Sequence, residues 1–281
     1  KLNQSVFKSA LLMRPVFEAA RAANRRIVFS EGEDERVLRG AQAILEETTE
    51  TPILIGRPEV IESRCERLGL DIRPGRDFQI VNPANDPRYY DYWTSYHRLM
   101  QRHGVTPDLA KAIMRTNTTA IGAIMVHRGE ADSLICGTFG EYRWHMNYVN
   151  QTLGGDGYEP HGALSMMILE DGPLFIADTH VHIEPTPDQI AKSVIGAARH
   201  VRRFGLEPKI ALCPQSQFGN TNCDSGARLR GALDILDGQQ HDFIYEGEMN
   251  IDTALDPELR ERIFPNSRLE GAANVLIFAH A

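Results

Sequence analysis

The loop at residues 214–222 carries the side chains best suited to holding an anion. A short apolar run at 209–213 predicts a buried strand that leads into it, and a helical pattern begins at Asp224. The loop offers the polar side chains of Ser216, Gln217, Asn220 and Thr221. Gly219 lets the backbone approach a ligand closely. Strand, Gly-bearing polar loop and helix start together present backbone N–H groups to an anion, here without any Lys or Arg in the loop itself.

A second pattern, His180-Val181-His182, has the spacing that metal-dependent hydrolases use for Zn²⁺ or Fe²⁺. Asp178 and Glu184 are candidates for additional carboxylate ligands. No second His/Asp cluster of matching spacing follows along the chain. We therefore favour two polar histidines at a strand end and expect no bound metal.

Three polar segments have both a chemical and a structural interpretation. Glu246 and Glu248 could serve as an acid–base pair, or they could cap a helix near 253. Segment 30–35 superficially resembles a phosphate loop, but its four acids would repel phosphate, so we expect no nucleotide site there. The cluster at 115–119 is explained by helix capping, with a ligand-facing role as the less favoured alternative. GxGxxG, Walker and GxSxG motifs are absent from the sequence.

The composition is that of a globular protein with 281 residues, of which 42% are hydrophobic and 24% are charged. This length suits one large domain or two ordinary ones. A net charge of −8 weighs against a nucleic-acid partner and against attachment to an anionic membrane. Four scattered cysteines without CxxC spacing favour a reducing, cytoplasmic setting.

Strands alternate with helices along the chain, which predicts an α/β fold with a mostly parallel sheet covered on both faces. The first half has expected strands at 26–30, 52–56, 78–81 and 133–136, and expected helices at 33–47, 58–68, 86–103, from 107, at 117–127 and at 142–153. The second half has expected strands at 161–169, 174–177, 209–213, 242–245 and 274–279, and expected helices at 187–204, 224–236 and 253–263. The turn at 170–173 predicts an antiparallel hairpin.

The chain's boundaries carry two further expectations. Three glycines within 154–157 predict a domain boundary, which separates residues 1–153 from residues 158–281. The N-terminal segment predicts an amphipathic helix because Lys8 and Arg14 interrupt its apolar residues. The sequence ends on a predicted buried strand, so we expect a fragment of a longer protein.

Collinear segments over nearly the whole chain carry a resemblance to a known family. They are IVFSEGEDERVLRGAQ, PILIGRPEVI, GVTPDLAKAIMRTNTTAIGAIMVHRGEADSLICGTFGEYRWH, LFIADTHVHIEPT, VRRFGLEPKIAL and FPNSRLEGAANVLIF. In this order they resemble the phosphate acetyl/butyryltransferase family, and more closely the phosphotransacetylase-like C-terminal half of bacterial multidomain NADP-dependent malic enzymes. The resemblance implies a two-domain α/β fold of the isocitrate/isopropylmalate-dehydrogenase-like kind, a ligand cleft between the domains, and a homodimer or higher homo-oligomer.

Departures from the family pattern imply that the domain is not catalytic. Working members carry a loop of the form LSxSTKGS, whereas residues 212–219 read LCPQSQFG, keeping Ser216 and a nearby glycine but no lysine. The family's DGE appears as EGE at 246–248. The arginine that follows the family's GAxHS segment has only an approximate counterpart in Arg143, and no NDLSRG-like segment occurs before the end of the sequence. Since an acyl phosphate needs cationic donors, we expect no catalytic residue and no acetyl transfer.

The resemblance therefore predicts a regulatory and oligomerising domain that senses acetyl-CoA and carries no cofactor of its own. NADP, a divalent metal and the oxidative decarboxylation of malate to pyruvate belong to an N-terminal malic-enzyme half of the same chain. The ligand-binding residues expected here are Ser216, Gln217, Gly219, Asn220, Thr138, Arg143 and Arg115. The alternatives are an active phosphate acetyltransferase, a metal hydrolase built on the two histidines, and an inert dimerisation scaffold.

Overall fold

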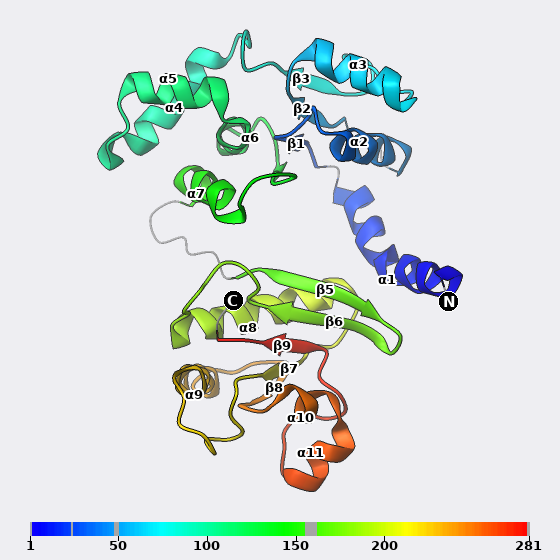
Figure 1. Ribbon diagram of the computed structural model, residues 1–281, viewed down its shortest axis with the longest axis vertical. Coiled ribbons are helices and arrows are strands. Elements are labelled where there is room, and N and C mark those ends of the chain that lie inside the picture. Colours follow the sequence, from blue (N-terminus) through cyan, green and yellow to red (C-terminus); the bar gives the residue numbers. More distant parts are fainter. Residues whose placement is uncertain (1, 24, 48–50, 155–161, 280–281) are drawn as a thin grey trace. The chain divides into compact units, whose positions relative to one another are not determined.

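The computed structural model describes residues 2–23, 25–47, 51–154 and 162–279, with side chains from residue 11 onward (Figure 1). It divides into two compact units, Glu18–Glu159 and Lys1–Phe17 with Pro160–Ala281. We call the first the four-stranded unit and the second the five-stranded unit, after their sheets. The glycines at 155 and 157, which carry the predicted boundary, lie outside the described residues.

The four-stranded unit is built on a parallel sheet in the order β3-β2-β1-β4. Its strands are β1 (Ile27–Phe29), β2 (Ile53–Ile55), β3 (Gln79–Val81) and β4 (Ser133–Ile135). After β1 the chain moves outward through β2 to β3, and then returns to place β4 on the other side of β1. The order of strands thus reverses between β1 and β4, which is where open α/β sheets commonly bind ligands.

Helices cover both faces of this sheet, as the alternating pattern predicted (Figure 1). The helices are α2 (Glu35–Glu47), α3 (Pro58–Leu68), α4 (Tyr89–Met100), the 3₁₀ turn η1 (Gln101–His103), α5 (Pro107–Thr116), α6 (Thr118–His127) and α7 (Tyr142–Leu153). Phe29 and Leu54 pack with α2 and α3, whereas Val28 and Ile55 pack with α4, α5 and α6. Successive side chains of a strand point to opposite faces, and because helices cover both faces the central strands β1 and β2 are apolar throughout.

The five-stranded unit contains a mixed sheet in the order β5-β6-β9-β7-β8. Its strands are β5 (Leu164–Leu169), β6 (Gly172–Ala177), β7 (Lys209–Leu212), β8 (Ile244–Gly247) and β9 (Val275–Ile277). The pair β5 and β6 is antiparallel, so the predicted hairpin is confirmed, and the remaining pairs are parallel.

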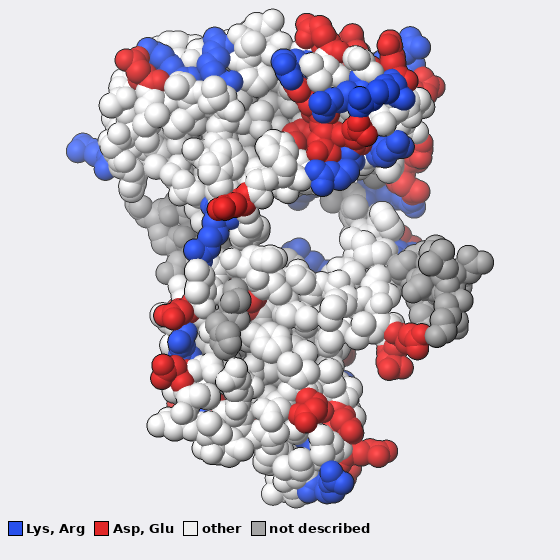
Figure 2. Space-filling view, viewed as in Figure 1, with Lys and Arg blue, Asp and Glu red and all other residues white. Residues whose placement is uncertain are grey.

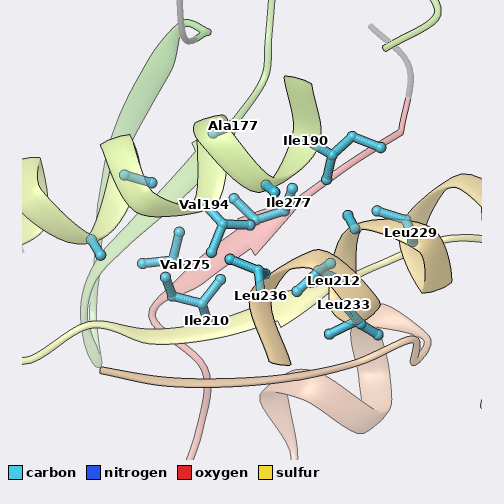
Figure 3. Packing of buried hydrophobic residues seen from close by; sticks show 14 of the residues in the cluster. Ala177, Ile190, Val194, Ile210, Leu212, Leu229, Leu233, Leu236, Val275 and Ile277 are labelled. Carbon is cyan, nitrogen blue, oxygen red and sulfur yellow. The ribbon is translucent and has the colours of Figure 1, made fainter. Parts of the chain in front are cut away.

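Helices α8 (Pro187–Arg203) and α9 (Asp224–Asp237) bury one face of the five-stranded sheet (Figure 3). Val194 of α8 and Leu236 of α9 meet Ile210 and Val275 of the sheet in one apolar cluster. A capping box at Thr186 fixes the start of α8. The other face packs against α10 (Ile251–Leu255) and the segment around 269–273, with α11 (Pro257–Ile263) following α10.

Two predicted elements of the five-stranded unit are placed differently. The strand expected at 242–245 lies at 244–247, because its ladder with β7 continues as far as Leu212 opposite Gly247. The helix expected at 253–263 is broken into α10 and α11 at Asp256. The Asp256 side chain accepts the Leu259 N–H at 3.0 Å and Pro257 follows it, which makes Asp256 the cap of a new helix.

The N-terminal segment is helical, as expected, and forms α1 (Leu2–Ala23), which continues through Pro15. Within the described ranges, no helix combines the length and the apolar character needed to cross a membrane.

Candidate functional site

The predicted anion-binding loop after β7 closes around a carboxylate of the protein itself. Glu248 follows β8, which is paired in parallel with β7, so the carboxyl ends of both strands lie at the same edge of the sheet. Glu248 Oε1 accepts the Gly219 N–H at 2.9 Å and an Arg230 guanidinium N–H at 2.6 Å, and it also accepts the Ser216 hydroxyl. The Phe218 N–H donates to the Glu248 carbonyl at 2.8 Å. The donors that we expected to face a ligand therefore face an internal anion.

This carboxylate is fully buried, with a side-chain exposure of 0%. Among the described residues its second oxygen, Oε2, has no hydrogen-bond partner. That oxygen faces the first turn of α9, where a Cβ added to Gly226 would lie only 2.9 Å away. A side chain at 226 would have to displace the buried carboxylate, which favours glycine at this position.

Arg230 is the residue at this site that the sequence did not reveal. We expected the loop to draw cationic groups from Arg115 and Arg143, but Arg230 of α9 already supplies one, with 38% of its side chain exposed. The sequence does contain a signal. Gly226 and Arg230 are four residues apart, so they lie on the same face of α9.

The other predicted residues of the loop lie at its rim. The Gln217 N–H donates to Asn220 Oδ1 at 2.9 Å, the Asn220 N–H returns a bond to the Gln217 carbonyl, and Gln217 Nε2 donates to Thr253 at 3.1 Å. Gly219 has φ of +80°, which explains the glycine there. Gly219 and Asn220 are exposed, whereas Ser216 is only 1% exposed and its hydroxyl is committed to Glu248. The residues that a ligand can reach are thus those of the rim.

Thr138, Arg143 and Arg115 belong to the four-stranded unit. The Thr138 carbonyl accepts a hydrogen bond from Arg36 at 2.5 Å. Arg143 is exposed on α7. The Arg115 guanidinium stacks 3.5 Å from the ring centroid of Tyr89 and donates to the Pro83 carbonyl at 2.7 Å.

The histidine pair lies beside a second internal carboxylate, Asp178, directly after β6. Asp178 Oδ1 accepts the backbone N–H groups of Ala163, His180 and Val181, and Oδ2 accepts the N–H of His182. Burial alone would raise the pKa of Asp178, but these backbone bonds lower it overall. His182 Nδ1 lies 2.8 Å from Oδ2. Within the part of the chain that the structure describes, no three His, Cys, Asp or Glu side chains are grouped so as to hold a metal ion.

The acids at 31–35 were our reason to expect no nucleotide site, and several of them are paired with arginines. Glu33 is paired with Arg57 through two contacts of 2.8 Å, and Asp34 is paired with Arg36 at 3.0 and 2.9 Å. Figure 2 shows acidic and basic side chains interspersed over the region of α2 and α3. The repulsion argument counted charges along the sequence, and the pairing weakens it for Glu33 and Asp34, while the absence of a nucleotide site stays a prediction.

The comparisons with known proteins agree with this architecture. Residues 11–280 match the family of phosphate acetyl/butaryl transferases, so the chain belongs to that family. The chain is 25% identical to a phosphotransacetylase from Streptococcus pyogenes, with a TM-score of 0.79 over 95% of this chain and 82% of that one. For the EutD phosphotransacetylase from Staphylococcus aureus the identity is 24% and the TM-score 0.80, over 96% of this chain and 82% of that one. The predicted phosphotransacetylase fold is confirmed.

Two further relatives, both malic enzymes, are more similar in sequence to this chain. The chain is 49% identical over 280 residues to the NAD-dependent malic enzyme of Rhizobium meliloti, which covers 99% of this chain and 36% of the relative. It is 46% identical over 278 residues to the NADP-dependent malic enzyme of Salmonella typhimurium, covering 99% of this chain and 37% of that protein. The predicted resemblance to the phosphotransacetylase-like region of bacterial malic enzymes is confirmed. The chain spans little more than a third of the length of these relatives.

Proposed function

We propose that this chain is a regulatory and oligomerising phosphotransacetylase-like region that binds acetyl-CoA without transferring the acetyl group. Its membership of the phosphate acetyl/butaryl transferase family supports an acyl-CoA ligand. Its 46–49% identity to a region of malic enzymes supports a role within a longer protein of that kind.

The observation that carries the absence of transfer is the internal carboxylate in the loop after β7. Transfer to or from an acyl phosphate needs cationic and N–H donors aimed at the phosphoryl oxygens. Here the Gly219 N–H and the Arg230 guanidinium are committed to Glu248. A phosphoryl group in the same place would lie beside a buried negative charge, and like charges repel strongly in a low-dielectric site.

The remainder of the longer protein would carry the redox chemistry in this proposal. There, malate would be oxidatively decarboxylated to pyruvate with NADP or NAD and a divalent metal. This region would form a homodimer or higher homo-oligomer and report the acetyl-CoA level to the malic-enzyme half. Such coupling is reciprocal: if acetyl-CoA changes the affinity for malate by some factor, malate changes the affinity for acetyl-CoA by the same factor.

Two measurements on the 281-residue chain test the proposal. Calorimetric titration with acetyl-CoA should give saturable binding, and a coupled assay with acetyl phosphate and CoA should give turnover at least ten times below an ordinary enzyme rate of about 10 s⁻¹. Turnover near that rate would establish an active acetyltransferase instead. Absence of acetyl-CoA binding together with a stable dimer would leave a scaffold.

A further inference from the structure

A cavity of about 720 Å³ lies in the four-stranded unit where three of its helices end. Its lining includes Met100, His127 and Leu153, the last residues of α4, α6 and α7. The volume falls within the range of about 300–1,000 Å³ that is typical of small-molecule pockets. The C-terminal end of a helix carries a partial negative charge and leaves carbonyl oxygens without partners in the helix. Three such ends around one cavity favour a ligand with a positively charged N–H donor.

Two polar side chains near the end of α7 add acceptors that have no partner of their own. Thr152 is only 3% exposed, and both Thr152 and Asn150 line the cavity. Among the described residues, neither Thr152 Oγ1 nor Asn150 Oδ1 has a hydrogen-bond partner. Buried polar atoms are nearly always hydrogen-bonded, so two without partners beside one cavity point to a ligand that supplies the donors.

The other polar groups of the lining suit an anion. Arg98 lines the cavity together with His103 and His127, and the described part of the lining contains no Asp or Glu. None of these three side chains forms an ion pair or a hydrogen bond with a described residue. The buried Tyr96 hydroxyl donates to Gln151 Oε1 at 2.8 Å, so the Gln151 amide keeps its N–H groups for a ligand. Burial raises the pKa of Tyr96 to about 12, which keeps this hydroxyl a donor at neutral pH.

A ligand with only one charged group satisfies half of this lining. A simple carboxylate would find Arg98 but would leave the oxygens of Thr152 and Asn150 without donors. A simple amine would meet the Arg98 guanidinium with no carboxylate in the described lining to offset it. A zwitterion satisfies both sets of groups. The rest of the lining is apolar and suits a hydrocarbon side chain: Leu99, Met100, Val105 and Leu153.

From this arrangement we infer that the cavity binds a free α-amino acid with an apolar side chain. The ammonium group donates to Thr152 and Asn150, and the carboxylate accepts from Arg98 and Gln151. The inference goes beyond the proposed function, because it involves neither acetyl-CoA nor the loop after β7.

The probes are L-leucine, L-methionine and L-phenylalanine, titrated calorimetrically into the 281-residue chain. We expect saturable binding of at least one of them. Arg98→Met and Thr152→Val should each weaken that binding by at least about tenfold, the effect of losing a hydrogen bond to a charged group. The matched controls are Arg102→Met and Thr116→Val, which change exposed residues outside the lining and should bind like the parent.

Two analogues of leucine test the need for both charges. Isocaproate keeps the carboxylate and the hydrocarbon chain but lacks the ammonium group, whereas isoamylamine lacks the carboxylate. Both should bind at least about tenfold more weakly than L-leucine.

The inference is refuted if none of the three amino acids binds, or if the Arg98 and Thr152 variants bind as tightly as their controls. Isocaproate that binds as tightly as L-leucine would overturn the amino-acid site in favour of a simple anion site. Acetyl-CoA binding is titrated separately into the same variants, so this inference and the proposed function can fail independently.

Discussion

Replacing Arg230 by methionine tests whether the internal ion pair holds the loop after β7. Methionine keeps most of the side chain's apolar length but removes the donor 2.6 Å from Glu248 Oε1. Among the described residues, the carboxylate would then keep the Ser216 hydroxyl and the Gly219 N–H as its donors. We expect the five-stranded unit to lose unfolding free energy as a result.

The magnitude follows from the burial of the two partners. Breaking a fully buried pair costs about 3–5 kcal/mol, and losing a hydrogen bond to a charged group costs about 1.5–3 kcal/mol. Because 38% of the Arg230 side chain is exposed, water can reach the vacated position, which favours the lower range. We therefore expect a loss of about 2 kcal/mol. With a urea dependence of about 1–3 kcal/mol per M, the midpoint of this unit should fall by roughly 1 M.

The measurement must resolve one unit, since a chain with two units need not unfold in one step. Hydrogen exchange of amides in β7 and β8, followed through a urea series, reports the five-stranded unit alone. Exchange of the Gly219 amide should accelerate at a lower urea concentration than exchange of the strand amides. Arg228→Met is the control on the same helix, because Arg228 Nη1 is buried without a hydrogen-bond partner among the described residues, so its removal breaks no comparable bond. If both variants change stability equally, within about 0.5 kcal/mol, the ion-pair reasoning is refuted.

Three further predictions concern single residues. Asp178 has a lowered pKa in the folded chain, so the stability that it contributes is present above the unfolded pKa of about 3.9 and is lost as pH falls through the folded pKa. The difference in urea midpoint between the parent and Asp178→Asn should therefore shrink below about pH 4. A difference that stays constant with pH would contradict this prediction. Gly226→Ala brings a Cβ to 2.9 Å from the Glu248 carboxylate and should lower the unfolding free energy by about 1–3 kcal/mol. Gly40→Ala, whose Cβ meets no atom within 4 Å, should raise the unfolding free energy by about 0.4–1 kcal/mol. Melting curves compare the two variants, and equal shifts in melting temperature would show that the contact at 226 is relieved. Valine at position 219 would be strained by about 1–2 kcal/mol at φ of +80°. The Gly219→Val variant should remain folded by circular dichroism but lose acetyl-CoA binding by calorimetry. Unchanged affinity would show that the acetyl-CoA site does not include this loop.

Much of the fold could be predicted because its signals are local. Short apolar runs bounded by turn residues predicted the strands. The helices expected from 107 and at 187–204 start in the structure after the capping residues Thr106 and Thr186. Placement failed where long-range pairing decides it. The strand at β8 extends into Glu246 and Gly247 because β7 offers backbone partners there. The break before α11 had a local signal, Asp256 followed by Pro257, which our prediction of one helix over 253–263 did not use.

The candidate site was harder to predict, because its central contact joins segments far apart in the sequence. The sequence shows a glycine-bearing loop at 214–222 and an acid at 248 after a predicted strand, but their meeting depends on β7 and β8 being neighbours in the sheet. Without that pairing, the sequence offers Glu248 only as a member of an acid–base pair or as a helix cap. Arg230 escaped notice for the same reason, since its role depends on which face α9 turns toward the loop.

Glu31, Asp178 and Glu248 share one arrangement, which bears on the absence of acetyl transfer that we propose. Each follows a strand, is buried, and accepts backbone N–H groups from a nearby loop. The carboxyl ends of parallel strands expose such N–H groups, which must find an acceptor when they are buried. In an enzyme the acceptor can be a substrate anion, and the site is then incomplete until the substrate binds. Here a carboxylate of the chain completes each site, so the loops are ordered without a ligand, and an incoming phosphate finds those donors already engaged.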